Sequence, residues 1–112
     1  MIEGLELAKT AATLADDMQA EEIMVLDLKG ISSITDYFVI CTGTSKPHLK
    51  AIQREIREKL KNDHGVAPAS ADGKPESEWV VLDYGDVIVH VFHTDKRGHF
   101  ALEDLWGDAP RI

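Results

Sequence analysis

The chain has 112 residues, of which 44% are hydrophobic, and these values fit a single domain spanning residues 1–112. Twelve basic against twenty acidic residues give a formal net charge of −8, which disfavours broad binding to a phosphate backbone and favours a protein partner. The one cysteine, Cys41, excludes an internal disulfide and a zinc site built from several cysteines. No apolar run reaches the roughly 20 residues of a membrane span and no signal peptide is recognisable, so we expect a cytoplasmic protein without a membrane partner.

The first part of the chain predicts one helix followed by two strands. Apolar residues keep helical spacing over residues 2–20, and residues 23–28 are typical of a strand. Residues 37–41 are apolar without interruption, whereas a strand with one face in water would alternate. We therefore expect a central strand at about 37–42, buried on both faces, with helices packed over it.

A second helix is predicted from about Pro47. A hydroxyl group of Thr44 or Ser45 can cap its start, Pro47 suits its first turn, and Gly65 ends it. Half of all the basic residues lie in this segment, namely Lys46, Lys50, Arg54, Arg57, Lys59 and Lys61. A solvated helix face explains this charge, and the alternative is a local contact with RNA or with an acidic protein surface.

The second half of the chain predicts mainly strands. Residues 65–77 indicate a loop or a short irregular strand, and residues 79–82 and 87–92 indicate a β-hairpin. A short acidic helix is expected at about 98–106. Strands on either side of a helix suggest a mixed sheet of four or five strands flanked by helices, an α/β domain rather than an α+β one.

Three histidines near the end of the hairpin raise the hypothesis of a metal site. His90 and His93 are three residues apart, so on a regular strand they point to opposite faces and do not easily share one ion with His99. We prefer an interpretation with one histidine at the sheet surface and the others in the following loop. The sequence therefore predicts no metal site and no cofactor.

The strand-to-helix junction at residues 43–46 raises the hypothesis of an anion site. A helix start presents free N–H groups, although capping alone explains the same residues, and neither a phosphate-binding loop nor a dinucleotide fingerprint has this spacing. A nucleotide-binding or nucleotidyl-transfer enzyme is the alternative function. Magnesium-dependent transfer needs converging carboxylates, whereas a tight turn already explains Asp83 and Asp86.

Few aromatic residues are available as contact residues. Trp79 opens the hairpin, and for it a core position and a contact role are equally supported. Tyr84 is expected in the two-residue turn with Gly85, where its side chain would be exposed and suited to a contact. Trp106 lies among leucines, which favours the core.

Three long motifs resemble the Iojap family, the ribosomal silencing factors. They are SSITDYFVICTGTS at 32–45, WVVLDYGDVIVHVF at 79–92 and LEDLWGDAP at 102–110. With the helix between them, the resemblance covers nearly the whole chain. It implies a nucleotidyltransferase-like α/β fold without the catalytic acids of the enzymes, so the protein is expected not to be an enzyme.

The resemblance also implies a function. Members of that family bind the large ribosomal subunit through its fourteenth ribosomal protein and sterically block association with the small subunit. Translation is thereby repressed, and a part in ribosome biogenesis is proposed for the family. A minor contact of the basic helix with ribosomal RNA would be compatible with this function.

The partner-binding surface implied by the resemblance falls on the hairpin and on the segment after it. Trp79 and Tyr84 become the leading contact residues, and Arg97 and Leu102 are weaker candidates. Relatives often have an aromatic pair after the basic residue, whereas this chain has Gly98 first, which could loosen the contact there. A homodimer through an exposed sheet edge is left open.

Overall fold

A computed structural model describes residues 2–30, 35–72 and 78–94 of the chain. Its elements follow in the order α1 (Gly4–Asp17), β1 (Glu21–Asp27), β2 (Tyr37–Gly43), α2 (Lys46–His64), β3 (Ser70–Asp72), β4 (Trp79–Asp83) and β5 (Val87–His93). All the elements predicted within these ranges are confirmed, and β3 is the short strand that was weighed against a loop. The helix predicted at 98–106 lies outside the described residues.

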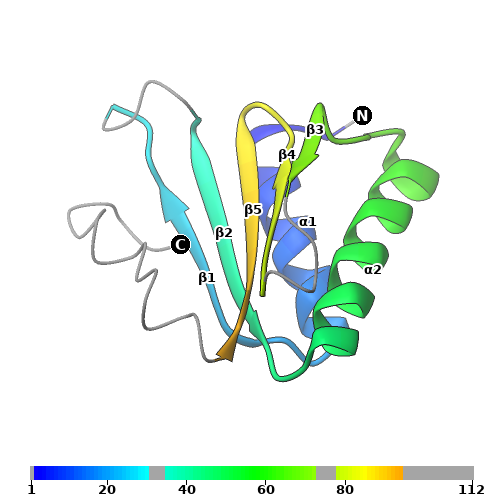
Figure 1. The fold of residues 1–112 in the computed structure, drawn as a ribbon. Coiled ribbons are helices and arrows are strands. Elements are labelled where there is room, and N and C mark those ends of the chain that lie inside the picture. Colours follow the sequence, from blue (N-terminus) through cyan, green and yellow to red (C-terminus); the bar gives the residue numbers. More distant parts are fainter. Residues whose placement is uncertain (1, 31–34, 73–77, 95–112) are drawn as a thin grey trace.

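The five strands form one mixed sheet in the order β1-β2-β5-β4-β3 (Figure 1). β2 and β5 pair in parallel, with Tyr37 opposite Val87 and Cys41 opposite Val91, and the other pairs are antiparallel. Two parallel strands that lie side by side need a long crossover connection. Between β2 and β5 this connection consists of α2, β3 and β4. The predicted α/β class with a mixed sheet is therefore confirmed.

Both helices pack on the same face of the sheet (Figure 1). Alternate residues of β2, Tyr37, Val39 and Cys41, join the core that includes both helices. Ile40 belongs to a separate buried cluster on the other face, together with Phe92 of β5. The expectation that β2 is buried on both faces is confirmed, but the helices in the described part of the chain cover only one of them.

The helix ends follow from local sequence chemistry. Ser45 precedes α2, and its hydroxyl oxygen accepts a hydrogen bond from the His48 backbone N–H at 3.2 Å, as in an N-cap. Gly65 ends the helix in the left-handed conformation, with φ of +68°, which glycine adopts without strain. Neither described helix is long and apolar enough to cross a membrane.

Candidate docking surface

Trp79 is half-buried at the start of β4 and is held on two sides. Its ring stacks on Phe92, directly opposite in the antiparallel pair, with the ring centroids 5.2 Å apart. Its indole N–H donates a hydrogen bond to Nδ1 of His90 at 3.3 Å. A tryptophan fixed in this way loses little side-chain freedom when a partner covers the rest of it.

His90 is buried beneath this tryptophan, with only 6% of its surface exposed. The Phe38 ring meets it edge-on at 4.6 Å between centroids, and burial lowers the pKa of His90 to about 4. Because Nδ1 accepts the Trp79 hydrogen bond, the proton of the neutral ring lies on Nε2, which has no hydrogen-bond partner within the part of the chain that the structure describes.

The burial of His90 corrects the expectation that one histidine lies at the sheet surface. Its Nδ1 is already engaged by Trp79, and aromatic rings surround the rest of it. Within residues 2–30, 35–72 and 78–94, no three His, Cys, Asp or Glu side chains come together as potential metal ligands. The arrangement in this region is thus one of packing and hydrogen bonding.

Other apolar side chains lie beside Trp79 on the same face of the sheet. Met24 of β1, Phe38 of β2 and Trp79 are each half-buried and pack on the fully buried cluster beneath them. We call these three residues the Trp79 face. It is the face of the sheet opposite the two helices.

Tyr84 lies on the other face, and the expectation that its side chain is exposed is wrong. Its ring packs against the core that the two helices share, and its hydroxyl is buried without a hydrogen-bond partner among the described residues. Burial raises the pKa of Tyr84 to about 12, and the positive charge of Arg57 opposes that rise in part. Trp79 and Tyr84 therefore do not form one continuous surface.

The position of the turn explains this burial. The Tyr84 backbone N–H donates to the Val87 carbonyl at 2.8 Å, so the two central residues of the turn are Gly85 and Asp86, one position later than expected. Gly85 has φ of +89°, which fits the first central position of a type II′ turn. Tyr84 continues the alternation of the strand and follows Leu82 onto the helix face.

Arg97 and Leu102, the weaker candidate contacts, lie outside the described residues.

The acidic side chains of the hairpin turn bind backbone groups of the protein. Asp83 accepts a hydrogen bond from the Gly85 N–H at 2.8 Å through Oδ1. Asp86 accepts one through Oδ2 from the N–H of Gly4, the first residue of α1. A carboxylate at a helix start satisfies a free N–H and interacts favourably with the helix dipole. Both acids thus have structural partners.

The start of α2 is also occupied by the protein itself. The Thr44 N–H donates to Nδ1 of His48 at 3.0 Å, and Nε2 of the same ring donates to the Met18 carbonyl at 2.8 Å. A Cβ on Gly43 would lie 2.6 Å from Cδ2 of Leu49, so this glycine allows the strand to approach the helix closely. These contacts support capping and close packing as the explanation of the junction.

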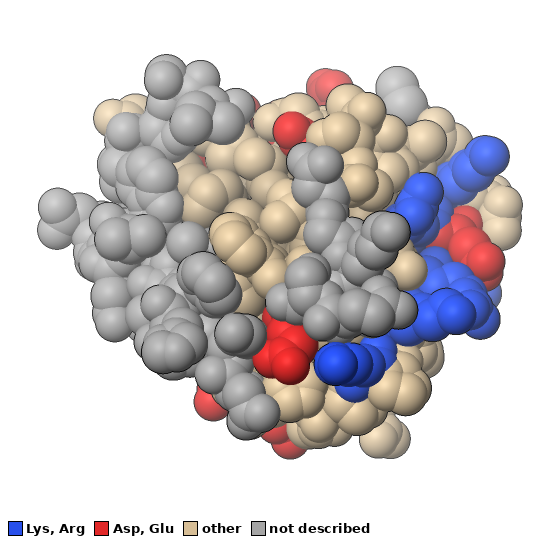
Figure 2. Space-filling model, in the orientation of Figure 1, with Lys and Arg blue, Asp and Glu red and all other residues tan. Residues whose placement is uncertain are grey.

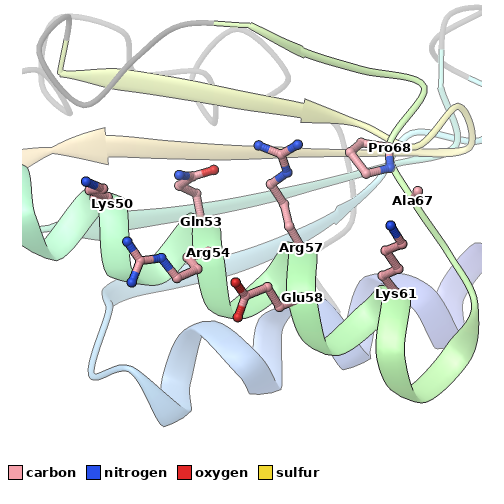
Figure 3. Close-up of a pocket in the computed structure, with 8 residues that line it drawn as sticks. All are labelled: Lys50, Gln53, Arg54, Arg57, Glu58, Lys61, Ala67 and Pro68. Carbon is pink, nitrogen blue, oxygen red and sulfur yellow. The ribbon is translucent and has the colours of Figure 1, made fainter.

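A basic groove lies along α2, with a volume of about 520 Å³ (Figure 3). In addition to Gln53, Glu58, Ala67 and Pro68, it is lined by the four cations Lys50, Arg54, Arg57 and Lys61. We call this the α2 groove. Figure 2 shows Lys and Arg side chains gathered on the side of the molecule where α2 lies.

Comparison with known proteins places this fold in a family. Residues 2–112 match the family model described as ribosomal silencing factor during starvation. The chain belongs to the ribosomal silencing factor family. A ribosomal silencing factor of Bacillus subtilis is 47% identical over 104 residues, which cover 93% of this chain and 87% of that protein.

Two further relatives agree with this assignment. A chloroplastic Iojap protein of Arabidopsis thaliana is 37% identical over 110 residues, covering 98% of this chain and 45% of the longer plant protein. The crystal structure of a Chromobacterium violaceum protein superposes with a TM-score of 0.88 at 33% identity, covering 95% of this chain and 88% of that one. The resemblance to the Iojap family is therefore confirmed, and so is the α/β fold with its mixed sheet.

The silencing-factor motifs that were recognised in the sequence come together in the structure. The first contains β2 and the second contains the β4–β5 hairpin, and β2 pairs with β5 along its whole length. The two motifs thus build the centre of the sheet, including the buried cluster under the Trp79 face.

Proposed function

We propose that this silencing factor binds the large ribosomal subunit in the cytoplasm through the fourteenth ribosomal protein of that subunit. The bound domain sterically blocks association with the small subunit and thereby represses translation. The match to the silencing-factor family over residues 2–112 supports this proposal. Steric exclusion needs only a stable domain and a docking surface, so the proposed action involves no catalysis.

The observation that carries the docking site is the fixed and half-buried Trp79. Tryptophan is enriched among residues that dominate binding energy, and such residues act best when their conformation is set before binding. Phe92 and His90 set the conformation of Trp79 on two sides. Met24 and Phe38 extend its apolar surface, which a ribosomal protein would cover.

The other predicted contact residues are proposed to have smaller roles than Trp79. Arg97 and Leu102 come after the hairpin in sequence and would add to a surface centred on Trp79. Tyr84 lies on the helix face, so we propose that it supports the hairpin, and any contact would be limited to the exposed part of its ring. A homodimer through edge strand β1 or β3 stays a prediction that sedimentation velocity can test.

The alternative is a nucleotide-binding or nucleotidyl-transfer enzyme. Specific contacts disfavour it: Asp83 and Asp86 bind backbone N–H groups, and the Thr44 N–H is engaged by His48. A magnesium–ATP titration followed by NMR separates the two functions. Shifts of the Thr44 and Ser45 amide signals would favour the enzyme, and unchanged signals are expected here.

Co-sedimentation with separated ribosomal subunits tests the proposal. We expect selective binding to the large subunit, and Trp79→Ala should weaken it by about 2 kcal/mol or more, roughly 30-fold. Met24→Ala on the same face should weaken it less. Leu14→Ala is the matched control, because Leu14 is a half-buried apolar residue on α1, on the helix side of the sheet.

Two checks make the result decisive. Thermal unfolding shows whether each variant is folded, since Trp79 also packs on Phe92. Wild-type protein that fails to bind the large subunit would contradict the function. Folded Trp79→Ala and Met24→Ala variants that bind like wild type would leave the function standing and contradict this docking site.

A further inference from the structure

The α2 groove concentrates positive charge in an acidic protein. Residues 46–64 carry six basic and three acidic residues, a net charge of +3, whereas the remainder of the chain has six basic and seventeen acidic residues, a net charge of −11. Four of those six cations line one groove, and among the described residues Glu58 is the only acidic one that lines it. Charge of one sign that lines a concave surface strengthens the local field.

The spacing of the four cations follows from the helix. They stand at intervals of four, three and four residues, so they share one face of α2 over roughly 16 Å of helix axis. All four side chains are exposed. The buried stripe of α2, which begins at Leu49, packs on the sheet from the other side of the helix.

These cations are available for an external anion. Within the part of the chain that the structure describes, no salt bridge joins Lys50, Arg54, Arg57 or Lys61 to a carboxylate. In Figure 3 the Arg57 side chain extends from the helix toward the strands above it. Exposed charges without an internal partner gain most from a polyanion that contacts several at once.

The lining of the groove favours a phosphate backbone over an acidic protein surface. Protein docking sites centre on aromatic or aliphatic anchors, whereas the apolar lining that the described part of the chain contributes here is limited to Ala67 and Pro68. No aromatic residue within 2–30, 35–72 and 78–94 lines the groove, which also disfavours stacking with splayed bases of a single strand. Folded RNA, which presents regularly spaced phosphates at its surface, fits these features best.

We propose that the α2 groove binds the phosphate backbone of folded RNA. Lys50, Arg54, Arg57 and Lys61 each contact phosphate oxygens, and Gln53 adds a neutral hydrogen-bonding group between them. The groove and the Trp79 face lie on opposite sides of the sheet, so RNA and a protein partner can bind at the same time. The overall charge of −8 makes the RNA contact weak alone and useful as an addition to docking.

Fluorescence anisotropy with a labelled RNA hairpin tests this site, using a stem of about 16 base pairs at several salt concentrations. The groove variant is Lys50→Gln with Lys61→Gln. The matched control is Lys46→Gln with Lys59→Gln, which removes the same charge from the same helix outside the groove. We expect the groove variant to bind about tenfold more weakly, with a salt slope smaller by about 2, and the control to stay near wild type.

The outcomes are distinct from those of the docking experiment. Trp79→Ala should keep wild-type affinity for the RNA hairpin even if it fails to bind ribosomal subunits. Equal effects of the groove and control variants, or wild-type protein that does not bind the hairpin at low salt, would overturn the groove proposal. Tighter binding of a labelled polyglutamate peptide than of the hairpin would overturn it in favour of an acidic protein partner.

Discussion

The buried His90 makes stability depend on pH in a predictable direction. In the folded protein burial lowers the pKa of His90 to about 4, whereas its ordinary value is 6.5. Between these values the unfolded chain binds a proton that the folded protein does not, so acid favours unfolding. The contribution of the neutral His90 to folding stability is fully present above pH 6.5 and is lost as the pH falls toward 4.

The magnitude follows from the size of the shift. The full difference in pKa corresponds to about 3 kcal/mol, and linkage gives a loss of about 2 kcal/mol between about pH 7.5 and about pH 5. Urea unfolding at these two pH values measures the loss in unfolding free energy, with His90→Phe as the comparison. Other titrating groups contribute in both proteins, so the drop should be about 2 kcal/mol smaller in the variant.

A neighbouring residue provides the control for disturbed packing. Phe92→Leu perturbs the same buried cluster without removing an ionisable group, so it should lower stability equally at both pH values. Parallel pH curves for wild type and His90→Phe would refute the reasoning. That result would mean that the imidazole is either solvated or charged in the folded protein.

Three further substitutions test how the framework is held. Asp86→Ala removes the acceptor for the Gly4 N–H at the start of α1, and urea unfolding should show a loss of about 1 kcal/mol. Gly43→Ala places a Cβ 2.6 Å from Leu49 Cδ2, and thermal unfolding should reveal a loss of about 1–3 kcal/mol. Tyr84→Phe removes a buried hydroxyl without a partner among the described residues, so its urea midpoint should equal or exceed wild type, and a clear drop would reveal a missed hydrogen bond.

The elements with strong local signals could be predicted from the sequence. The apolar run in β2 and the capping residues around α2 identified both elements within one or two residues of their ends. The hairpin strands were also placed correctly. These features depend on neighbours in the chain, which is the information that a single sequence contains.

The register of the hairpin could not be fixed in the same way. A turn centred on Tyr84 and Gly85 differs by one position from the observed one, and that shift decides whether Tyr84 is counted as turn or as strand. A stricter use of alternation from Val80 through Leu82 would have placed Tyr84 on the helix face.

The contacts of Trp79 and His90 depend on the same register. Trp79 lies opposite Phe92, and His90 lies opposite Val81, which brings both rings next to the indole. With the turn one position earlier, Trp79 would have faced His90 directly, and the stacked pair with Phe92 would be absent. Trp79 could therefore be identified as a candidate contact residue from the sequence, but the contacts that fix its side chain could not be predicted.

The separation of the two faces makes the binding data interpretable. Trp79 packs on one buried cluster, whereas the cations Lys50 and Lys61 belong to α2, which packs on the other face of the sheet. Substitutions that share no partner usually add in free energy. If both surfaces contact the large subunit, combining Trp79→Ala with the groove substitutions should give the sum of the separate losses. A combined loss no larger than that of Trp79→Ala would mean that the groove contributes only after the Trp79 face has docked.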